Sequence, residues 1–376
     1  MRKKILFIAN VDWFYCSHRL NIGLEAIKDD YEVHLAAKFT GCEDKLIPLG
    51  FNLHPLVIDR GSNLIKTVKS FFQIFYLIKK IKPDIVHAIT IKPIIFGGFL
   101  AKFFTKVSFV ASVSGLGYLF ISSDLKALLI KFFAKFLFRF VFSKEKLKVI
   151  FQNQEDLNTI TKICKLNFKK TVLIRGSGID LDIFKPVKSK SDDNNKNILF
   201  ASRLLKSKGI IEFIESAKRL KSKNLTFMIA GMLDKENPDC ISMEQIYHWE
   251  RSGIIKYCGY IENMRDLICN SKIVVLPSYY GEGLPKILIE AAACGKPVVT
   301  TDHQGCRDAL IPNKTGLLIP IKDSKALTSA LTKLLNSPNL YEKMEIAARE
   351  FAVKNFDIKC VIEKHLRIYS DLIKNY

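Results

Sequence analysis

The feature that most constrains the fold is an alternation of short apolar runs with helical patterns, which occurs twice along the chain. β-Branched and aromatic runs predict a first set of strands at 3–11, 31–37, 84–90, 107–113 and 147–153. A second set is predicted at 197–202, 225–231, 254–260, 272–278 and 296–301. Strands that alternate with helices favour a parallel, doubly wound sheet. The sequence therefore predicts an α/β protein with two such domains in tandem.

The boundary between the predicted domains lies near a polar stretch at Lys185–Lys196, which lacks hydrophobic periodicity and is a linker or an exposed loop. We expect an N-terminal domain of residues 1–180, a C-terminal domain of residues 181–356 and a last helix at about 357–376. A chain of 376 residues, 48% of them hydrophobic, can bury two cores of ordinary size.

The net charge of +21 indicates attraction to an anionic partner: nucleic acid, anionic lipid or a phosphorylated substrate. Segments 64–83 and 125–148 carry basic residues among phenylalanines, and those of the second segment recur every four or five positions: Lys126, Lys131, Lys135 and Arg139. Basic amphipathic helices of this kind are typical of membrane-surface proteins. The alternative is a core helix with lysines on its solvent face, and one helix can do both. Nucleic acid is disfavoured because the phenylalanines lie within helices.

The cysteines and the chain start indicate a cellular compartment. Nine cysteines are scattered without a C-x-x-C pair, which favours reduced thiols in a cytoplasm over disulfides or a zinc site. The first residues, MRKKILFIANVDWFY, do not resemble a signal peptide, and no run of about 18 uncharged apolar residues predicts a membrane span. We expect a cytoplasmic protein, peripheral on the inner face of the cell membrane.

The segment Tyr279–Thr301, YYGEGLPKILIEAAACGKPVVTT, places two glutamates around the start of an apolar helix. The preceding KIVVLPS predicts a buried strand, and Gly281–Gly283 predicts a turn. Pro285 suits the first helical position, and the helix is expected to end at about Cys294, with Gly295 just beyond it. The free N–H groups and the dipole at such a helix start can bind an anion.

Glu290 lies in the middle of this apolar helix, and a buried carboxylate needs a partner. One interpretation is an ion pair with Lys286. When the lysine precedes the glutamate by four residues, such a pair contributes at most about a few tenths of a kcal/mol to helix stability. The other is that Glu290 accepts hydrogen bonds from the vicinal hydroxyls of a ribose, since its side chain leans toward the helix N-terminus. Glu282 would then face a sugar held at that terminus, or would only favour the helix dipole.

Further polar residues follow other predicted strands of the second domain. Arg203 and Lys208 lie either side of the loop after 197–202, and Gly231 ends the next strand. Ligands of open α/β sheets bind beyond the C-terminal strand ends. A guanidinium can clamp a diphosphate in a fork, and a lysine acts as a point charge, although a solvated turn is the alternative for R-x4-K-G. Together with the helix start and Glu290, these residues predict a nucleoside-diphosphate site.

These motifs together resemble glycosyltransferase family 4. The resemblance rests on EGLP with E-x7-E at 282–290, R-x4-KG at 203–209 and GSGIDLDIFKP at 176–186, which is similar to the hinge motif of that family. Segments 11–20, 86–98 and 112–120 resemble a bacterial branch that builds lipopolysaccharide O-antigen or capsule on undecaprenyl diphosphate. The resemblance implies a GT-B fold: two Rossmann-like domains facing a central cleft, with the acceptor bound by the first domain, the nucleotide sugar by the second, and the last helix returning to the first.

The resemblance also implies roles for individual residues. Glu290 would bind the donor ribose, Glu282 a hydroxyl of the donor sugar, and Arg203 with Lys208 would stabilise the departing diphosphate. Glu282, Arg203 and Lys208 form the expected catalytic set. The other expected donor contacts are Gly231, Tyr260, Ile261, Gly283, Leu284 and Pro285, of which Tyr260 and Ile261 lie where the base is usually bound.

Two departures from the family pattern concern the first domain. A glycine-rich first loop is replaced by NVDWFYCSHRL, and a histidine usual after the fourth strand is replaced by SGLG at 114–117. These glycines can bring main-chain amides to a phosphate. The expected acceptor-side residues are His18, Arg19, His87, Lys92, Ser114, Gly115 and Gly117. For each histidine, a purely structural side chain is the alternative.

The resemblance implies transfer with retention of anomeric configuration, for which we expect a front-face displacement dominated by electrostatic stabilisation of the diphosphate. No metal or other cofactor is expected, because the D-x-D of Asp180 and Asp182 falls in the hinge motif and is interpreted as structural. The expected donor is a UDP-sugar, with N-acetylgalactosamine favoured, and the expected acceptor is a polyprenyl-diphosphate-linked sugar at an anionic membrane surface. The alternatives are a UDP-sugar epimerase of the same fold and a non-enzymatic basic protein that binds a membrane surface or nucleic acid.

Overall fold

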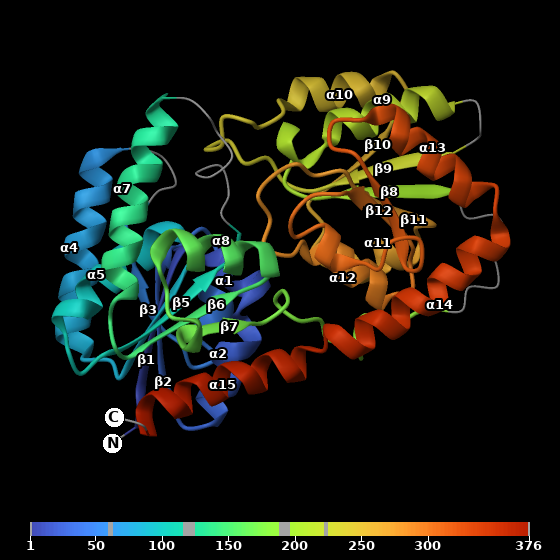
Figure 1. Cartoon of the computed structure of the whole chain (residues 1–376). Helices are drawn as coiled ribbons and strands as arrows, with labels where there is room; N and C mark the ends of the chain where they lie inside the picture. The colour runs from blue at the N-terminus through green and yellow to red at the C-terminus, as the bar shows by residue number, and fades with distance from the viewer. Residues whose placement is uncertain (1, 59–62, 116–124, 188–195, 222–224, 375–376) are drawn as a thin grey trace. The chain divides into compact units, whose positions relative to one another are not determined.

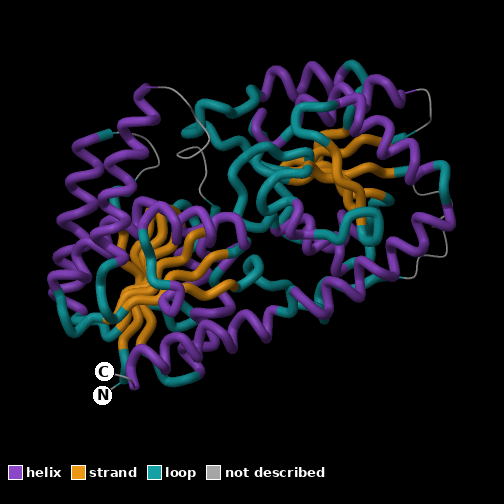
Figure 2. The backbone as a smooth tube through the Cα atoms, in the orientation of Figure 1, coloured by secondary structure: helices purple, strands orange, loops and turns teal. Residues whose placement is uncertain are grey.

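The computed structural model describes residues 2–58, 63–115, 125–187, 196–221 and 225–374, and for 125–133 it describes the backbone alone. The chain divides into two compact units: unit 1 comprises Met1–Gly178 and Lys359–Tyr376, and unit 2 comprises Ile179–Ile358. Each unit has a parallel sheet at its centre with helices on both faces (Figure 1, Figure 2). The predicted pair of doubly wound α/β domains is confirmed.

The described strands of unit 1 form a parallel sheet in the order β3-β2-β1-β4-β5-β6-β7. They are β1 (Lys4–Val11), β2 (Glu32–Lys38), β3 (Asn52–Pro55), β4 (Ile85–Ile89), β5 (Ser108–Val113), β6 (Leu147–Phe151) and β7 (Thr171–Leu173). The order reverses between β1 and β4, because β2 and β3 lie on one side of β1 and all later strands lie on the other. The carboxyl ends of β1 and β4 therefore flank the topological switch point, where open α/β sheets bind ligands.

Helices cover both faces of this sheet (Figure 2). They are α1 (Asp12–His18), α2 (Leu20–Lys28), α3 (Glu43–Leu46), α4 (Leu64–Ile81), α5 (Ile91–Phe103), α7 (Leu125–Phe142), α8 (Gln154–Cys164) and, from the end of the chain, α15 (Ile358–Lys374). Tyr369 Oη of α15 lies 2.7 Å from His87 Nδ1 of β4, and Ser108 Oγ of β5 donates to Leu372 O at 3.2 Å. The expected return of the last helix to the N-terminal domain is confirmed.

Unit 2 repeats this plan with described strands in the order β10-β9-β8-β11-β12-β13. They are β8 (Asn197–Ala201), β9 (Thr226–Ala230), β10 (Lys256–Gly259), β11 (Ile273–Leu276), β12 (Val298–Thr301) and β13 (Gly316–Ile319). The helices are α9 (Ile210–Leu220), α10 (Met243–Arg251), α11 (Met264–Cys269), α12 (Lys286–Ala293), α13 (Ser324–Leu335) and α14 (Pro338–Asn355). Its switch point lies between β8, which precedes Arg203 and Lys208, and β11, which precedes the glutamate turn.

All the predicted strands are present, with ends shifted by a few residues, but three further strands were missed. These are β3, β7 and β13, and each forms an end of its sheet. Each has only three or four residues, which is too short to show the alternation or the length by which a strand is recognised in a sequence. The predicted strand at 147–153 and the predicted helix at 125–148 overlap, and the structure ends α7 at Phe142 and begins β6 at Leu147.

Helix α4 carries apolar residues on two faces. Ile74, Ile78 and Ile81 are buried in the unit 1 core. A second stripe faces solvent, with exposed fractions between 41% and 80%: Leu64, Ile65, Val68, Phe72, Phe75 and Tyr76. At about 100° per residue, this stripe lies on the side of the helix opposite to the buried face. None of the helices in the described part of the chain combines the length and the hydropathy that a membrane span requires.

Candidate active site

The loops after β8 and β11 meet in unit 2 and bring the predicted cations to the glutamate turn. Arg203 follows β8, and Lys208 ends a short 3-10 turn at Lys206–Lys208. Gly209, directly after that turn, has a φ of +81°, and a Cβ there would lie 2.2 Å from Pro277 O. Only glycine permits this close approach, so Gly209 lets the β8 loop pack against the chain that leaves β11.

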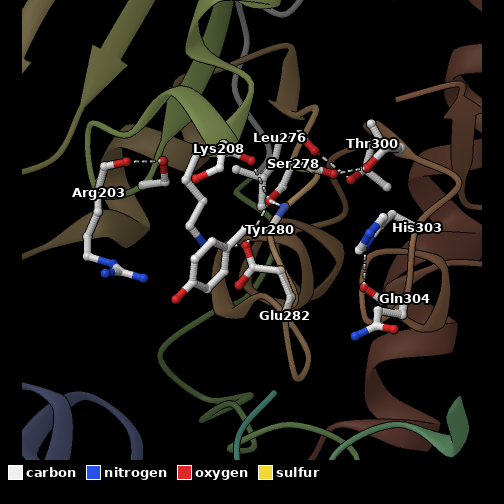
Figure 3. A network of polar contacts seen from close by, with 12 residues as sticks. Arg203, Lys208, Leu276, Ser278, Tyr280, Glu282, Thr300, His303 and Gln304 are labelled. Carbon is white, nitrogen blue, oxygen red and sulfur yellow. Dashed lines mark hydrogen bonds and ion pairs between the residues drawn. The ribbon is translucent and has the colours of Figure 1, made fainter. Parts of the chain in front are cut away.

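Lys208 and Glu282 form an ion pair at the centre of this site (Figure 3). The pair is shielded from solvent, because its side chains are 9% and 12% exposed. Ser278 Oγ lies 3.0 Å from Glu282 Oε1 and 3.3 Å from Ser207 O. The hydroxyl of Ser278 therefore connects the glutamate to the β8 loop and holds the carboxylate beside the lysine.

Arg203 is held by a carboxylate that the sequence did not single out. Its Nη1 lies 2.7 Å from Oδ2 of Asp234, which follows β9. The ring of Tyr280 lies close to both cations, with its centroid 5.6 Å from Arg203 Cζ and 5.3 Å from Lys208 Nζ (Figure 3). An aromatic face attracts cations at such distances. Neither Asp234 nor Ser278 belongs to a local motif, and Tyr280 is only one tyrosine of a pair, so sequence alone carried no signal for them.

Burial and charge act in opposite directions on the two cations. Burial lowers the pKa of the Lys208 ammonium, and the Glu282 carboxylate opposes that effect. Burial also acts to lower the pKa of Arg203, but the interactions with Tyr280 and with the Asp234 carboxylate outweigh it, so that this pKa lies above its usual value. Two shielded cations thus face two carboxylates. A diphosphate is the kind of anion that can take over such cations from their carboxylates.

Helix α12 begins beside this cluster and carries Glu290. Glu290 is 5% exposed, and its Oε1 lies 3.3 Å from Lys286 Nζ, so the ion pair considered as the simpler interpretation is present. Pro285 is the N-cap and not the first helical residue, because its ψ of 122° is extended. Its side chain makes no capping hydrogen bond. The helix ends at Ala293 with Gly295 at a φ of +70°, close to the expected end.

The glutamate turn is supported from the loop after β12. A Cβ at Gly305, which has a φ of +76°, would lie 2.6 Å from both Glu282 O and Gly283 O. Thr301 Oγ1 of β12 donates to Ser278 O. These contacts fix the main chain around Glu282, and they explain why a glycine is required at position 305.

The other predicted donor-binding residues differ in how far they are exposed to solvent. Gly231 has a φ of +148°, and a Cβ there would lie 1.8 Å from Ser202 O, so the end of β9 closely approaches the end of β8. Tyr260 is 65% exposed after β10, and Ile261 is half-buried. Gly283 and Leu284 are buried, and Leu284 packs in the unit 2 core. Lys208 and Glu282 are in direct contact. Tyr260 and Ile261 remain candidates for contact with the base because of their position after β10.

Among the predicted acceptor-side residues of unit 1, Arg19 and His87 are fully buried. His87 Nε2 lies 2.7 Å from Ser112 Oγ, and its Nδ1 contacts Tyr369 of α15. The His87 ring stacks on His365 at a centroid separation of 5.9 Å. Arg19 Nη1 donates to His18 O at 2.9 Å. These contacts of the His87 ring fit the structural alternative.

The remaining acceptor-side candidates lie nearer the surface. His18 ends α1, and its ring stacks on Phe14 at 4.2 Å. Lys92 lies in the first turn of α5 and is half-buried. Ser114 and Gly115 follow β5, with Gly115 at a φ of +100°. Gly117 lies outside the described residues.

The D-x-D pair lies in a turn at the start of unit 2. Asp180 Oδ1 accepts hydrogen bonds from the main-chain N–H groups of Asp182 and Ile183 at 2.9 and 3.1 Å. A carboxylate that accepts from the next residues in this way stabilises a turn. This geometry supports the structural interpretation of Asp180.

Comparisons with known proteins agree with this geometry. Residues 4–154 match the family model described as glycosyl transferase 4-like, and residues 183–351 match the model described as glycosyl transferases group 1. A Campylobacter jejuni protein, N,N'-diacetylbacillosaminyl-diphospho-undecaprenol alpha-1,3-N-acetylgalactosaminyltransferase, is 31% identical over 94% of this chain and 94% of its own. The chain belongs to glycosyltransferase family 4.

Two further comparisons concern the branch and the fold of this glycosyltransferase. An Escherichia coli protein, UDP-Gal:alpha-D-GlcNAc-diphosphoundecaprenol alpha-1,3-galactosyltransferase, is 27% identical over 84% of this chain and 82% of its own. The solved structure of sucrose-phosphate synthase from Thermosynechococcus elongatus superposes with a TM-score of 0.84 at 19% identity, covering 100% of both chains. The glycosyltransferase thus has the expected GT-B fold, and it is an enzyme of the surface-polysaccharide branch.

Proposed function

We propose that this glycosyltransferase moves a hexose or N-acetylhexosamine from a UDP-sugar to a sugar linked to a lipid diphosphate, with retention of anomeric configuration. The observation that carries the proposal is the cluster of Arg203 and Lys208 beside the glutamate turn and the start of α12. Two cations and a helix N-terminus are suited to the diphosphate of a nucleotide sugar. Glu290, one helical turn after Lys286, would hold the ribose hydroxyls.

Charge stabilisation would supply most of the rate enhancement. As the bond between the sugar and the diphosphate breaks, negative charge grows on the leaving oxygen. Preorganised cations in a shielded site stabilise such charge more strongly than water does. Arg203 and Lys208 would take that role, Glu282 would orient a donor hydroxyl, and the leaving phosphate would accept the acceptor proton. These groups require no metal ion for the step.

The relatives support the finer substrate assignment. The names of the Campylobacter and Escherichia relatives describe acceptors linked to diphospho-undecaprenol, and the second names UDP-galactose as its donor. We therefore propose a UDP-sugar donor and a polyprenyl-diphosphate-linked acceptor. N-acetylgalactosamine is the favoured donor sugar, because the Campylobacter relative transfers it. The base would lie near Tyr260 and Ile261, and Lys92 with Gly115 would lie on the acceptor side.

The nucleotide site can be tested by thermal unfolding with UDP, GDP and ADP. At about a hundred times its Kd, UDP is expected to raise the Tm by about 5 °C. Glu290→Gln keeps the shape of the side chain but weakens charge-assisted hydrogen bonds to a ribose, so its UDP affinity is expected to fall about 10- to 100-fold. Glu345→Gln is the matched control, because Glu345 pairs with Lys296 at 3.8 Å in the same unit. Equal UDP responses of both variants would leave Glu290 as a structural residue.

Product analysis separates the transferase from a UDP-sugar epimerase. We expect UDP-sugar incubated without an acceptor to remain the same stereoisomer, and UDP to be released when a polyprenyl-diphosphate-linked sugar is added. Interconversion of two UDP-sugars in the absence of acceptor would instead identify an epimerase.

An anionic membrane surface is the proposed partner of α4. The exposed stripe defined above is apolar, and the same helix exposes Lys66, Lys69, Lys79 and Lys80. Apolar residues can enter the interfacial region of a bilayer while neighbouring lysines meet anionic headgroups. This arrangement would hold the enzyme at the surface where a lipid-linked acceptor is found.

Flotation with vesicles tests this surface. Wild-type protein is expected to bind phosphatidylcholine vesicles that contain phosphatidylglycerol, and Ile65→Ser/Phe72→Ser is expected to lower the partition coefficient by about tenfold or more. Ile346→Ser/Val353→Ser is the matched control, because these residues are 58% and 47% exposed on α14 of unit 2. Equal losses in the two double variants would contradict a specific role for α4.

A further inference from the structure

Three polar atoms at the edge of the unit 1 sheet are buried without a hydrogen-bond partner. They are Asn10 Oδ1, Thr90 Oγ1 and Ser114 Oγ. A buried polar atom without a partner loses the hydrogen bonds that it would make with water, so each one needs an explanation. All three residues keep part of their surface exposed. Rotation of the side chain can therefore bring each polar atom to a ligand.

The three residues lie at the carboxyl ends of three neighbouring strands. Asn10 lies near the end of β1, Thr90 directly follows β4, and Ser114 directly follows β5. The register pairs Ile8 with Ala88, so Asn10 is level with Thr90. It also pairs Ile89 of β4 with Ser112 of β5, so Ser114 lies within one residue of the same level. The three residues therefore form a row across the carboxyl edge of the sheet, and we call them the polar row.

The polar row spans the switch point of unit 1, between β1 and β4. In unit 2 the corresponding point lies between β8 and β11, where Arg203 and Lys208 follow β8 and the glutamate turn follows β11. Both sheets are parallel and reverse order in the same way, so each offers a ligand site at its carboxyl edge. Unit 2 fills that position with charged groups, whereas the row in unit 1 has a carboxamide and two hydroxyls.

The backbone at Thr90 indicates that its position is imposed by its surroundings. Its φ is +74°, which is uncommon for a β-branched residue. Thr90 is the N-cap of α5, but its side chain does not cap the helix. A threonine at an N-cap normally accepts a hydrogen bond from the first turn. The Thr90 hydroxyl is therefore available to another group. The positive φ costs conformational free energy, which interactions of the folded protein or of a ligand must offset.

We infer that the polar row binds the hydroxyl groups of a pyranose sugar. A carboxamide oxygen accepts from a sugar hydroxyl, and the two hydroxyls can both donate and accept. The three side chains are uncharged and together offer several donors and acceptors, which is the chemistry that recognises a hydroxyl-rich ring. The inference rests on the proposed function, in which this ring is the terminal sugar of the acceptor, and it adds Asn10 and Thr90 as residues that select that sugar.

The test measures Tm with methyl glycosides of N-acetylglucosamine, N-acetylgalactosamine, galactose and glucose, each at about 100 mM, with sorbitol as a control for general stabilisation by polyols. Wild-type protein is expected to gain about 3 °C with at least one glycoside beyond the gain with sorbitol. Thr90→Val/Ser114→Ala, which removes both hydroxyls at nearly constant shape, is expected to lose that gain.

The matched control is Thr67→Val/Ser143→Ala, in which the lost hydroxyls donate to main-chain carbonyls of unit 1. It is expected to keep the glycoside response, and Ser114→Ala alone provides a milder variant for the same measurement. The inference would be overturned if wild type showed no gain in Tm specific to a glycoside. It would also be overturned if Thr90→Val/Ser114→Ala kept that gain, and ordered water would then be the partner of the row. The UDP response is measured in the same samples. A glycoside response without a UDP response would sustain the polar row and reject the proposed donor site.

Discussion

Lys208→Ala is expected to lower kcat by about 10²- to 10³-fold, the loss typical when one preorganised donor to a developing anion is removed. Lys208 is 7% exposed and sits between Glu282 and the Tyr280 ring, so water cannot readily replace it. The measurement is steady-state release of UDP with saturating acceptor, together with a thermal unfolding curve that shows the variant to be folded.

Lys206→Ala is the control for this substitution. Lys206 lies two residues earlier in the same 3-10 turn and is exposed, so its removal changes the local charge equally without touching the cluster. Its kcat is expected to stay within about twofold of wild type. A loss below tenfold in Lys208→Ala would show that the lysine does not stabilise the leaving group.

The ion pair adds a stricter requirement. If Lys208 and Glu282 act as one unit, Lys208→Ala/Glu282→Gln should be no slower than the slower of the two single variants, because residues that act together are strongly non-additive. If the loss of kcat in the double variant equals the product of the two single losses, the side chains contribute independently. Glu282 would then act on the donor sugar alone.

Acid is expected to destabilise the protein steeply below about pH 6.5, because two buried histidines of unit 1 are held neutral. Burial, reinforced by the charge of Arg19, lowers the pKa of His365 to about 3, and burial lowers the pKa of His87 well below its usual value. In the unfolded chain each histidine binds a proton near pH 6.5, whereas in the folded protein it stays neutral at that pH. Each histidine therefore removes about 1.4 kcal/mol of unfolding free energy per pH unit as the pH falls from 6.5 toward its folded pKa.

Denaturant titrations between pH 7 and pH 4.5 measure this slope. His365→Asn keeps a donor for Val361 O, which lies 2.7 Å from His365 Nδ1, but it cannot titrate. The slope is expected to fall by about 1.4 kcal/mol per pH unit in this variant. His248→Asn, at an exposed position of α10, should leave the slope unchanged. An unaltered slope in His365→Asn would mean that carboxylates dominate the acid response.

The sequence was sufficient for those parts of the site that depend on local pattern. The strand before Glu282, the helix that carries Glu290 and the loop with Arg203 and Lys208 each have a signature within about ten residues. The contacts between these segments have none. Asp234 and Ser278 reach the cluster because parallel strands bring separate loops to one edge, and that proximity depends on sheet order.

The first domain shows a second limit of local pattern. Arg19 and His87 are polar residues near predicted strand ends, which made them candidates for acceptor contact. His87 is covered by Tyr369 of α15, a helix that lies far along the chain from it. Asn10 and Thr90 lie in segments that resemble or depart from the family pattern, but a single asparagine or threonine has no pattern that predicts ligand contact.

The path of the chain also has a consequence for how the protein is made. Unit 2 is one continuous stretch, Ile179–Ile358, whereas unit 1 needs its last helix from Lys359–Tyr376. During synthesis from the N-terminus, the second unit leaves the ribosome complete before the first can cover His87 with Tyr369. Unit 1 therefore begins first and is completed last. A chain that ended before α15 would contain all of unit 2, whereas unit 1 would lack the helix that covers His87.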